Sequence, residues 1–341
     1  MKFALGATVG TAVLAGLATA AATKVAGRRF KRVTDASLDD AMDRPIGVTH
    51  HMIDIYDGAQ IHVVDCGPPD PTGRPIVLLH GVTLQWWVWS SVIRLLRADH
   101  RVLAWDMRGH GRSVAGTDGV TLEAAAEDLA ALLEELDVRG AIVVGHSMGG
   151  MVLGRFCLQH RDILEERVAG RVFLATSASS ISIKGLAGGL IAVSGHITRV
   201  AKAGLKNPRL AYKWANTDAA AAIIRPAFGD HPTARMIEDV RQMLASVPGT
   251  TLSEAGAAIA THDVSKDLAS VTGPTLVIVG DRDNLTPPSH AKLLAKEIPG
   301  ARLETLPTIG HQVMQEAPEL LVESLSRFES SLATAPAIRP S

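Results

Sequence analysis

One serine of this chain stands in a spacing that could make it a nucleophile. The segment Gly145-His146-Ser147-Met148-Gly149 follows the apolar run 141–144 and precedes a second apolar stretch at 151–158. This order predicts a strand, a sharp turn and a helix, with Ser147 at the apex of the turn. A glycine on each side of the apex gives so tight a turn the room it needs. The Ser147 hydroxyl would then stand clear of the sheet, ahead of the positive end of the next helix, and His146 would point away from it.

A serine hydroxyl attacks a carbonyl at neutral pH only with a base beside it and an acid that orients the base. His311 follows one predicted strand near the end of the chain, and Asp281 and Asp283 follow another. The chain order is then serine, acid and histidine, with each residue in a loop after a strand. The sequence therefore predicts a catalytic group of Ser147, His311 and one of the two aspartates.

The predicted elements would bring these loops together. Strands are expected at 52–56, 61–65, 76–79, 101–105, 141–144, 171–176, 275–279 and 302–306, and helices at 86–97, 122–136 and 313–332. Asp57-Gly58 between the first two strands indicates a hairpin, and Thr121 is a candidate N-cap. Strands that alternate with helices predict an α/β fold with a doubly wound, mostly parallel eight-stranded sheet.

One stretch interrupts this alternation. Residues 179–262 show a helical and loop-like pattern, which predicts a helical cap inserted over the carboxyl ends of the strands, where open α/β sheets bind ligands. The two parts of the core would then be 33–178 and 263–333, with residues 334–341 as a tail. Residues 1–32 would form a separate apolar segment with a basic flank.

The apolar part of that segment, residues 3–23, contains no charged residue and is followed by five lysines and arginines between 24 and 32. About 20 apolar residues suffice for a helix that spans a bilayer. The basic flank predicts a membrane anchor that keeps the catalytic domain in the cytoplasm. The alternative is a cleaved signal peptide, favoured by Ala18-Thr19-Ala20, with a secreted or cell-envelope product.

Composition limits the function classes. The 341 residues are 47% hydrophobic and 20% charged, which is typical of a globular chain with a large core. The net charge of −1 predicts no nucleic-acid partner. Cys66 and Cys157 are expected to be packing residues. No cluster has metal-ligand spacing and no glycine pattern fits a nucleotide, so we expect no metal and no cofactor.

Taken together, the motifs resemble the α/β-hydrolase superfamily over about 50–328. They are His80-Gly81, the segment Asp106-Met107-Arg108-Gly109-His110-Gly111-Arg112-Ser113, the serine turn, residues 280–287, and Gly310-His311. The chain is most similar in style to capped Ser-His-Asp esterases and lipases and to non-haem haloperoxidase-like members. The resemblance implies that Asp283 is the catalytic acid, with Asp281 as the fallback.

The same resemblance implies an oxyanion hole formed by the backbone N–H groups of Val82 and Met148. Trp86 and Trp89 follow the first of these donors and are candidates for the substrate pocket. His110 is expected to fix a loop rather than to do chemistry.

A serine at the turn argues against epoxide hydrolases and haloalkane dehalogenases, which resemble this chain elsewhere but carry aspartate there. We therefore expect a serine hydrolase that cleaves a carboxylic ester through an acyl-enzyme. The apolar run 186–193 and the N-terminal segment favour a hydrophobic or lipid-like ester as the small-molecule substrate. Alternatives are a carbon–carbon bond hydrolase, a haloperoxidase-like perhydrolase and a non-catalytic ligand-binding protein. The oligomeric state stays open.

Overall fold

The structure is a computed structural model that describes residues 42–180, 221 and 224–334. These residues form an eight-stranded sheet in the order β1-β2-β4-β3-β5-β6-β7-β8. The strands are β1 Thr49–Asp54, β2 Gln60–Cys66, β3 Ile76–Leu79, β4 Val102–Trp105, β5 Ala141–His146, β6 Val168–Leu174, β7 Thr275–Gly280 and β8 Arg302–Leu306. From β4 to β8 every neighbouring pair is parallel, whereas β2 pairs antiparallel with both β1 and β4. The predicted doubly wound sheet is confirmed.

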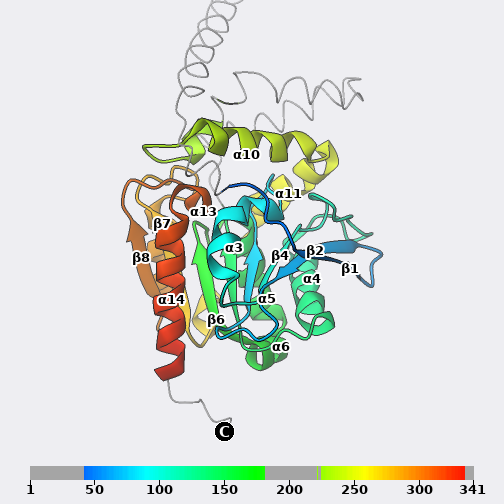
Figure 1. Ribbon diagram of the computed structural model, residues 1–341, viewed down its shortest axis with the longest axis vertical. Helices are drawn as coiled ribbons and strands as arrows, with labels where there is room; N and C mark the ends of the chain where they lie inside the picture. Colours follow the sequence, from blue (N-terminus) through cyan, green and yellow to red (C-terminus); the bar gives the residue numbers. More distant parts are fainter. Residues whose placement is uncertain (1–41, 181–220, 222–223, 335–341) are drawn as a thin grey trace, which may run out of the picture.

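Helices cover both faces of the sheet (Figure 1). The described helical segments are η1 Trp86–Trp89, α3 Ser90–Leu96, α4 Leu122–Glu135, α5 Met148–Gln159, α6 Arg161–Arg167, η2 Arg225–Ala227, α10 Ala234–Ser246, α11 Gly249–Thr261, η3 Leu268–Ser270, α12 Pro288–Glu297, α13 Val313–Glu316 and α14 Pro318–Thr334. Thr121 caps α4 by accepting a hydrogen bond from the Ala124 N–H at 3.1 Å, as expected.

The pleat of the buried strands divides the core into two layers. On β3, Val77 and Leu79 pack with residues of α4, α5 and α12, whereas Ile76 and Leu78 pack with residues of α3, α13 and α14. Because successive strand residues point to opposite faces, a continuous apolar run serves both layers. This explains why the central strands carry no polar face.

Two expected helices differ from the structure in their regularity. The segment 86–97 begins as a 3-10 helix over Trp86–Trp89 before α3, and 313–332 is divided into α13 and α14 at Ala317. Pro318 has no N–H to continue the first helix but suits the first position of the next one.

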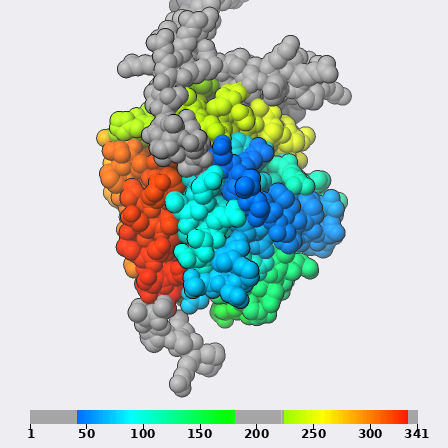
Figure 2. Space-filling model, in the orientation of Figure 1, coloured from blue at the N-terminus to red at the C-terminus, as the bar shows by residue number. Residues whose placement is uncertain are grey.

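Between β6 and β7, the cap helices α10 and α11 lie across the carboxyl-terminal end of the sheet (Figure 1). A bridge between Ser179 and Asp263 marks the base of this insertion. In the space-filling view the same helices form one end of the described molecule, and α14 runs along its side (Figure 2). The part of the expected cap at 181–220 and 222–223 lies outside the described residues.

Residues 3–23 also lie outside the described residues, and so does the tail from 335 onward. Within the described ranges, no helix combines the length and the apolar character that crossing a bilayer requires.

Candidate active site

Ser147 sits at a sharp corner between β5 and α5. Its φ and ψ angles are 53° and −118°, a backbone conformation that residues with a Cβ atom rarely adopt. Two hydrogen bonds hold the corner: the Ser147 N–H donates to the Leu174 carbonyl at 3.0 Å, and the Thr176 hydroxyl donates to the Ser147 carbonyl at 2.6 Å. The predicted strand, turn and helix are thus confirmed, with the serine at the apex.

The glycines around Ser147 are required by backbone contacts. A Cβ atom on Gly145 would lie 2.5 Å from the Gly149 carbonyl oxygen, and one on Gly149 would lie 2.6 Å from the Leu79 carbonyl oxygen. Such distances are well inside van der Waals contact, and the atoms involved belong to the backbone, so neither glycine position accepts a side chain without moving the turn.

Asp283 and His311 form a buried pair at the ends of β7 and β8. The His311 Nδ1–H donates to Asp283 Oδ2 at 2.9 Å, and both side chains are almost fully buried. Asp283 Oδ1 accepts the backbone N–H groups of Leu285 and Thr286, and the Thr286 hydroxyl donates to Oδ2 at 2.8 Å. With Nδ1 assigned as the donor, Nε2 is the ring nitrogen that can accept a proton.

Asp281 occupies a different place. Its side chain is 40% exposed, and its Oδ1 accepts the Thr308 N–H at 2.7 Å. It fixes the turn after β8, whereas Asp283 contacts the histidine.

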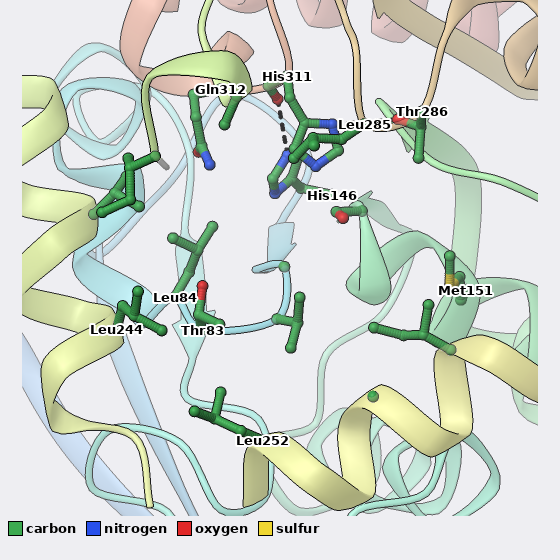
Figure 3. Close-up of a pocket in the computed structure, with 18 residues that line it drawn as sticks. Thr83, Leu84, His146, Met151, Leu244, Leu252, Leu285, Thr286, His311 and Gln312 are labelled. Carbon is green, nitrogen blue, oxygen red and sulfur yellow. Dashed lines mark hydrogen bonds between the residues drawn. The ribbon is translucent and has the colours of Figure 1, made fainter. Parts of the chain in front are cut away.

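Ser147 and His311 line one cavity of about 110 Å³ beneath the cap helices (Figure 3). The structure therefore brings together the three residues expected to act as nucleophile, base and acid. The remaining wall is mostly apolar and comes from both the core and the cap: Val82, Leu84, Met151, Ile224, Ala227, Val240, Leu244, Leu252, Gly256, Ile259 and Leu285, with Thr83, Thr286 and Gln312 as polar members.

Val82 and Met148 lie where the oxyanion hole is expected. Val82 lines the cavity in the loop after β3, and Met148 is the first residue of α5. Among the described residues neither backbone N–H has an acceptor. Two free N–H donors beside a serine suit an oxygen that acquires negative charge.

Two buried histidines hold the loop that carries Val82. The His80 Nδ1–H donates to the Gly81 carbonyl at 2.7 Å, and the Thr83 N–H donates to His110 Nε2 at 3.4 Å. Burial lowers the pKa of both imidazoles, that of His110 to about 3. Both therefore remain neutral and able to accept as well as donate, and His110 fixes a loop as expected.

His146 departs from the expectation that it points away from the site. It lines the cavity, its Nε2–H donates to the His311 carbonyl at 2.9 Å, and the two rings lie 4.7 Å apart (Figure 3). Complete burial, followed by the proximity of His311, lowers the pKa of His146 well below its usual value. The neutral ring thus connects the strand that leads to Ser147 with the loop of His311.

Trp86 and Trp89, expected near the substrate, lie in the core instead. Their exposed fractions are 7% and 0%, and neither is among the described residues that line the cavity. The 3-10 turn packs these rings into the layer with α3 and α14, and the Trp86 N–H donates to Asp106 Oδ1 at 2.9 Å.

Glu316 is a residue of the site that the sequence reasoning missed. Its carboxylate accepts the N–H of Gly310 at 3.1 Å and that of Gly229, which belongs to the cap, at 2.7 Å. Burial raises the pKa of Glu316 from 4.5 to about 7. The only sequence signal was an acidic residue within an otherwise uncharged stretch after His311.

Backbone bonds extend this junction between the cap and the histidine loop. The His311 N–H donates to the Ala227 carbonyl at 2.8 Å, and the Asp230 N–H donates to the Thr308 carbonyl at 3.0 Å. A Cβ on Gly310 would lie 2.3 Å from the Gly229 nitrogen. We call the two segments 227–230 and 308–311 the cap seam.

Known proteins resemble this chain in sequence and fold. A solved esterase from Rhodococcus sp. is 26% identical, with a TM-score of 0.66, and the match covers 84% of this chain and 100% of that one. A non-heme chloroperoxidase from Burkholderia pyrrocinia is 27% identical over 80% of this chain and 96% of its own length. An sn-1-specific diacylglycerol lipase from Mus musculus is 26% identical over 76% of this chain and 82% of its own.

A longer relative matches only in part. The dihydrolipoyllysine-residue acetyltransferase component of an acetoin cleaving system from Pseudomonas putida is 31% identical over 75% of this chain, and the match spans 63% of that protein. The family model described as alpha/beta hydrolase fold matches residues 74–318, a range that includes Ser147, Asp283 and His311. The chain therefore belongs to the alpha/beta hydrolase family.

Proposed function

We propose that this protein is a serine hydrolase that cleaves a carboxylic ester with an apolar acyl group. One observation carries the proposal. Ser147, at a strained corner, lines the same apolar cavity as His311, and His311 Nδ1 is hydrogen-bonded to the buried carboxylate of Asp283. This is the set of groups that acyl transfer through a serine requires.

In the proposed mechanism, Ser147 Oγ attacks the ester carbonyl carbon and gives its proton to His311 Nε2. The tetrahedral intermediate collapses, the C–O bond to the alcohol breaks, and His311 protonates the departing alkoxide. Water then gives a proton to His311 and attacks the acyl-enzyme, and the carboxylic acid leaves as Ser147 regains its proton. Asp283 keeps the ring oriented and stabilises the imidazolium.

The N–H groups of Val82 and Met148 are the proposed donors to the oxyanion in both halves of the reaction. They are backbone groups, held in place before the substrate arrives, and removing one such donor typically costs about 3 kcal/mol of transition-state stabilisation.

A perhydrolase activity is a second candidate, because relatives of this chain are named non-heme chloroperoxidases. Hydrogen peroxide would then replace water in the attack on the same acyl-enzyme and give a peroxy acid. The proposal needs no further residue, so we treat it as a side reaction of the esterase.

The test is hydrolysis of p-nitrophenyl esters by the full chain. Ser147→Ala should lower kcat/KM by about 10³-fold or more, because no other group supplies the nucleophile. Ser253→Ala, at an exposed serine of α11, is the matched control and should leave the activity unchanged.

Normal turnover by folded Ser147→Ala would refute the proposal. Absence of Ser147-dependent turnover on every ester would favour carbon–carbon hydrolysis of a vinylogous ketone. If that reaction also failed, a binding protein would be the remaining interpretation.

A further inference from the structure

One wall of the cavity contains a glycine that the fold does not need. Leu252, Gly256 and Ile259 of α11 line the cavity, and their spacing of four and three residues puts them on one face of the helix. Apart from its chain neighbours and the backbone of its own helix, no described atom lies within 4 Å of a Cβ built on Gly256, and φ at this position is not positive. A glycine inside a helix is less favourable than alanine. Neither backbone conformation nor packing against the described residues explains this glycine.

The surroundings of Gly256 differ from those of the glycines in the serine turn. A Cβ on Gly145 would meet backbone atoms at 2.5 Å, whereas a side chain on Gly256 would enter open space beside two apolar residues. Gly256 is also partly exposed, although Leu252 and Ile259 are buried. The missing side chain therefore leaves space in the cavity between Leu252 and Ile259 of α11.

The position of α11 relative to the base determines which part of an ester it meets. Figure 3 shows His311 and Gln312 at one end of the cavity and Leu252, on α11, at the other. In ester cleavage the histidine protonates the departing alcohol, so the alcohol must lie at the His311 end. The acyl group extends from the same carbonyl carbon in the other direction, toward α11.

We propose that Gly256 sets the length of the acyl chain that the enzyme accepts, as the floor of an acyl subsite between Leu252 and Ile259. This rests on the proposed ester hydrolysis and names its substrate class. The cavity volume of about 110 Å³ is somewhat below the roughly 150 Å³ that holds a benzene molecule. Because this volume includes the Ser147 end of the cavity, we expect the subsite to favour short acyl chains.

The experiment compares kcat/KM of the wild type with that of Gly256→Ala and Gly256→Leu on p-nitrophenyl acetate, butyrate, hexanoate and octanoate. A leucine side chain at this position removes the space that a chain longer than acetyl needs. We expect the ratio of kcat/KM on hexanoate to kcat/KM on acetate to fall tenfold or more in Gly256→Leu relative to the wild type. Gly256→Ala should give the same trend with a smaller loss, and it remains informative if the leucine variant does not fold.

Ala260→Leu is the matched control, because it adds the same side chain bulk to the exposed face of the same helix. Its chain-length profile should equal that of the wild type. A second series, in which the acyl group is acetyl and the alcohol is lengthened, tests the orientation. The Gly256 variants should not alter how kcat/KM depends on the length of the alcohol, and a change confined to the alcohol series would overturn the assignment to the acyl end.

A binding measurement keeps this inference separate from the proposed reaction. Straight-chain 2-alkanones are titrated calorimetrically into Ser147→Ala, where no turnover occurs. The affinity of Ser147→Ala for the ketone should rise by about fourfold per methylene until the subsite is full. Adding Gly256→Leu to Ser147→Ala should abolish this rise. An unchanged rise in the folded leucine variant would refute the subsite. If the protein hydrolysed no ester but its ketone affinity still rose with chain length as expected, only the proposed ester hydrolysis would be refuted.

Discussion

Four of the five non-glycine residues with positive φ in the described part of the chain follow strands at the carboxyl edge of the sheet. They are Thr83, Ser147, Ala175 and Thr308, and the fifth, Asp137, follows α4. Such conformations cost about 1–3 kcal/mol each and persist only where the surroundings enforce them. The strain at Ser147 accompanies a tight corner that places this residue at the wall of the cavity.

This strain predicts opposite stability effects for glycine at two serines. Ser147→Gly should be more stable than Ser147→Ala by about 1 kcal/mol, or roughly 3 °C in Tm, because glycine adopts φ of 53° without a clash. At Ser253, inside α11, glycine should be less stable than alanine by about 1 kcal/mol. Calorimetry of the four variants checks both signs, and a lower Tm for Ser147→Gly than for Ser147→Ala would show that the corner is relaxed.

At the scale of elements, two strands were predictable to the residue. The buried strand Ile76–Leu79 and the mostly exposed edge strand Arg302–Leu306 coincide with the predicted strands, because each is bounded by proline or glycine-rich turns. The helix break at Ala317 was missed, because an apolar pattern continues through Pro318 although the proline ends one helix and begins another. The core position of Trp86 and Trp89 was missed because 3-10 and α-helical turns present different faces from the same residues.

The short helix α13 ends in Glu316, which joins the cap to the histidine loop. Because burial raises the pKa of Glu316 from 4.5 to about 7, the folded protein keeps a proton there that the unfolded chain releases. Between about pH 4.5 and 7 the folded state therefore binds more protons than the unfolded state. Its contribution to stability is complete below this range and declines as the pH rises through it.

Glu316→Gln removes this titration and keeps the side chain's size. The Tm of the wild type minus that of Glu316→Gln should therefore fall by about 3 °C between pH 5 and pH 8, as measured by calorimetry. Glu323→Gln, at a side chain that is 64% exposed on α14, is the control and should give a constant difference. A difference for Glu316→Gln that is also independent of pH would mean that Glu316 does not change its protonation within this range.

At the scale of the whole molecule, the sequence predicted which residues form the candidate site better than it predicted the shape of the cavity around them. Parallel strands place their following loops at one edge, so Ser147, Asp283 and His311 could be brought together from motif order alone. The contact of His146 with His311 depends on a loop that is 165 residues away in the sequence. The cavity wall depends on how α11 packs over the sheet, and neither feature leaves a local pattern.

The contacts of the first described residues predict the effect of removing residues 1–32. Met42 is buried, the Asp43 carbonyl accepts a hydrogen bond from Arg94, and the Arg44 guanidinium lies 4.6 Å from the centre of the Trp87 ring. A chain that begins at residue 33 retains all three contacts. We expect it to hydrolyse esters as well as the full chain does.

We also propose that residues 3–23 attach the protein to membranes. In flotation with phospholipid vesicles, the full chain should then float and the shortened one should stay at the bottom. Loss of folding in the shortened chain would show that the segment belongs to the core, and equal behaviour of the two chains in flotation would refute the membrane role.

The cap seam has a consequence for how this fold can be recombined. Backbone atoms of 227–230 and 308–311 pair directly, and there is no space for a side chain at Gly229 or Gly310. A cap taken from another hydrolase would displace His311 unless it carried its own matching half of the seam. Breakpoints for chimaeras should therefore lie after residue 230, so that the host keeps both segments of the cap seam. Where caps are exchanged at other points, both segments are expected to change together.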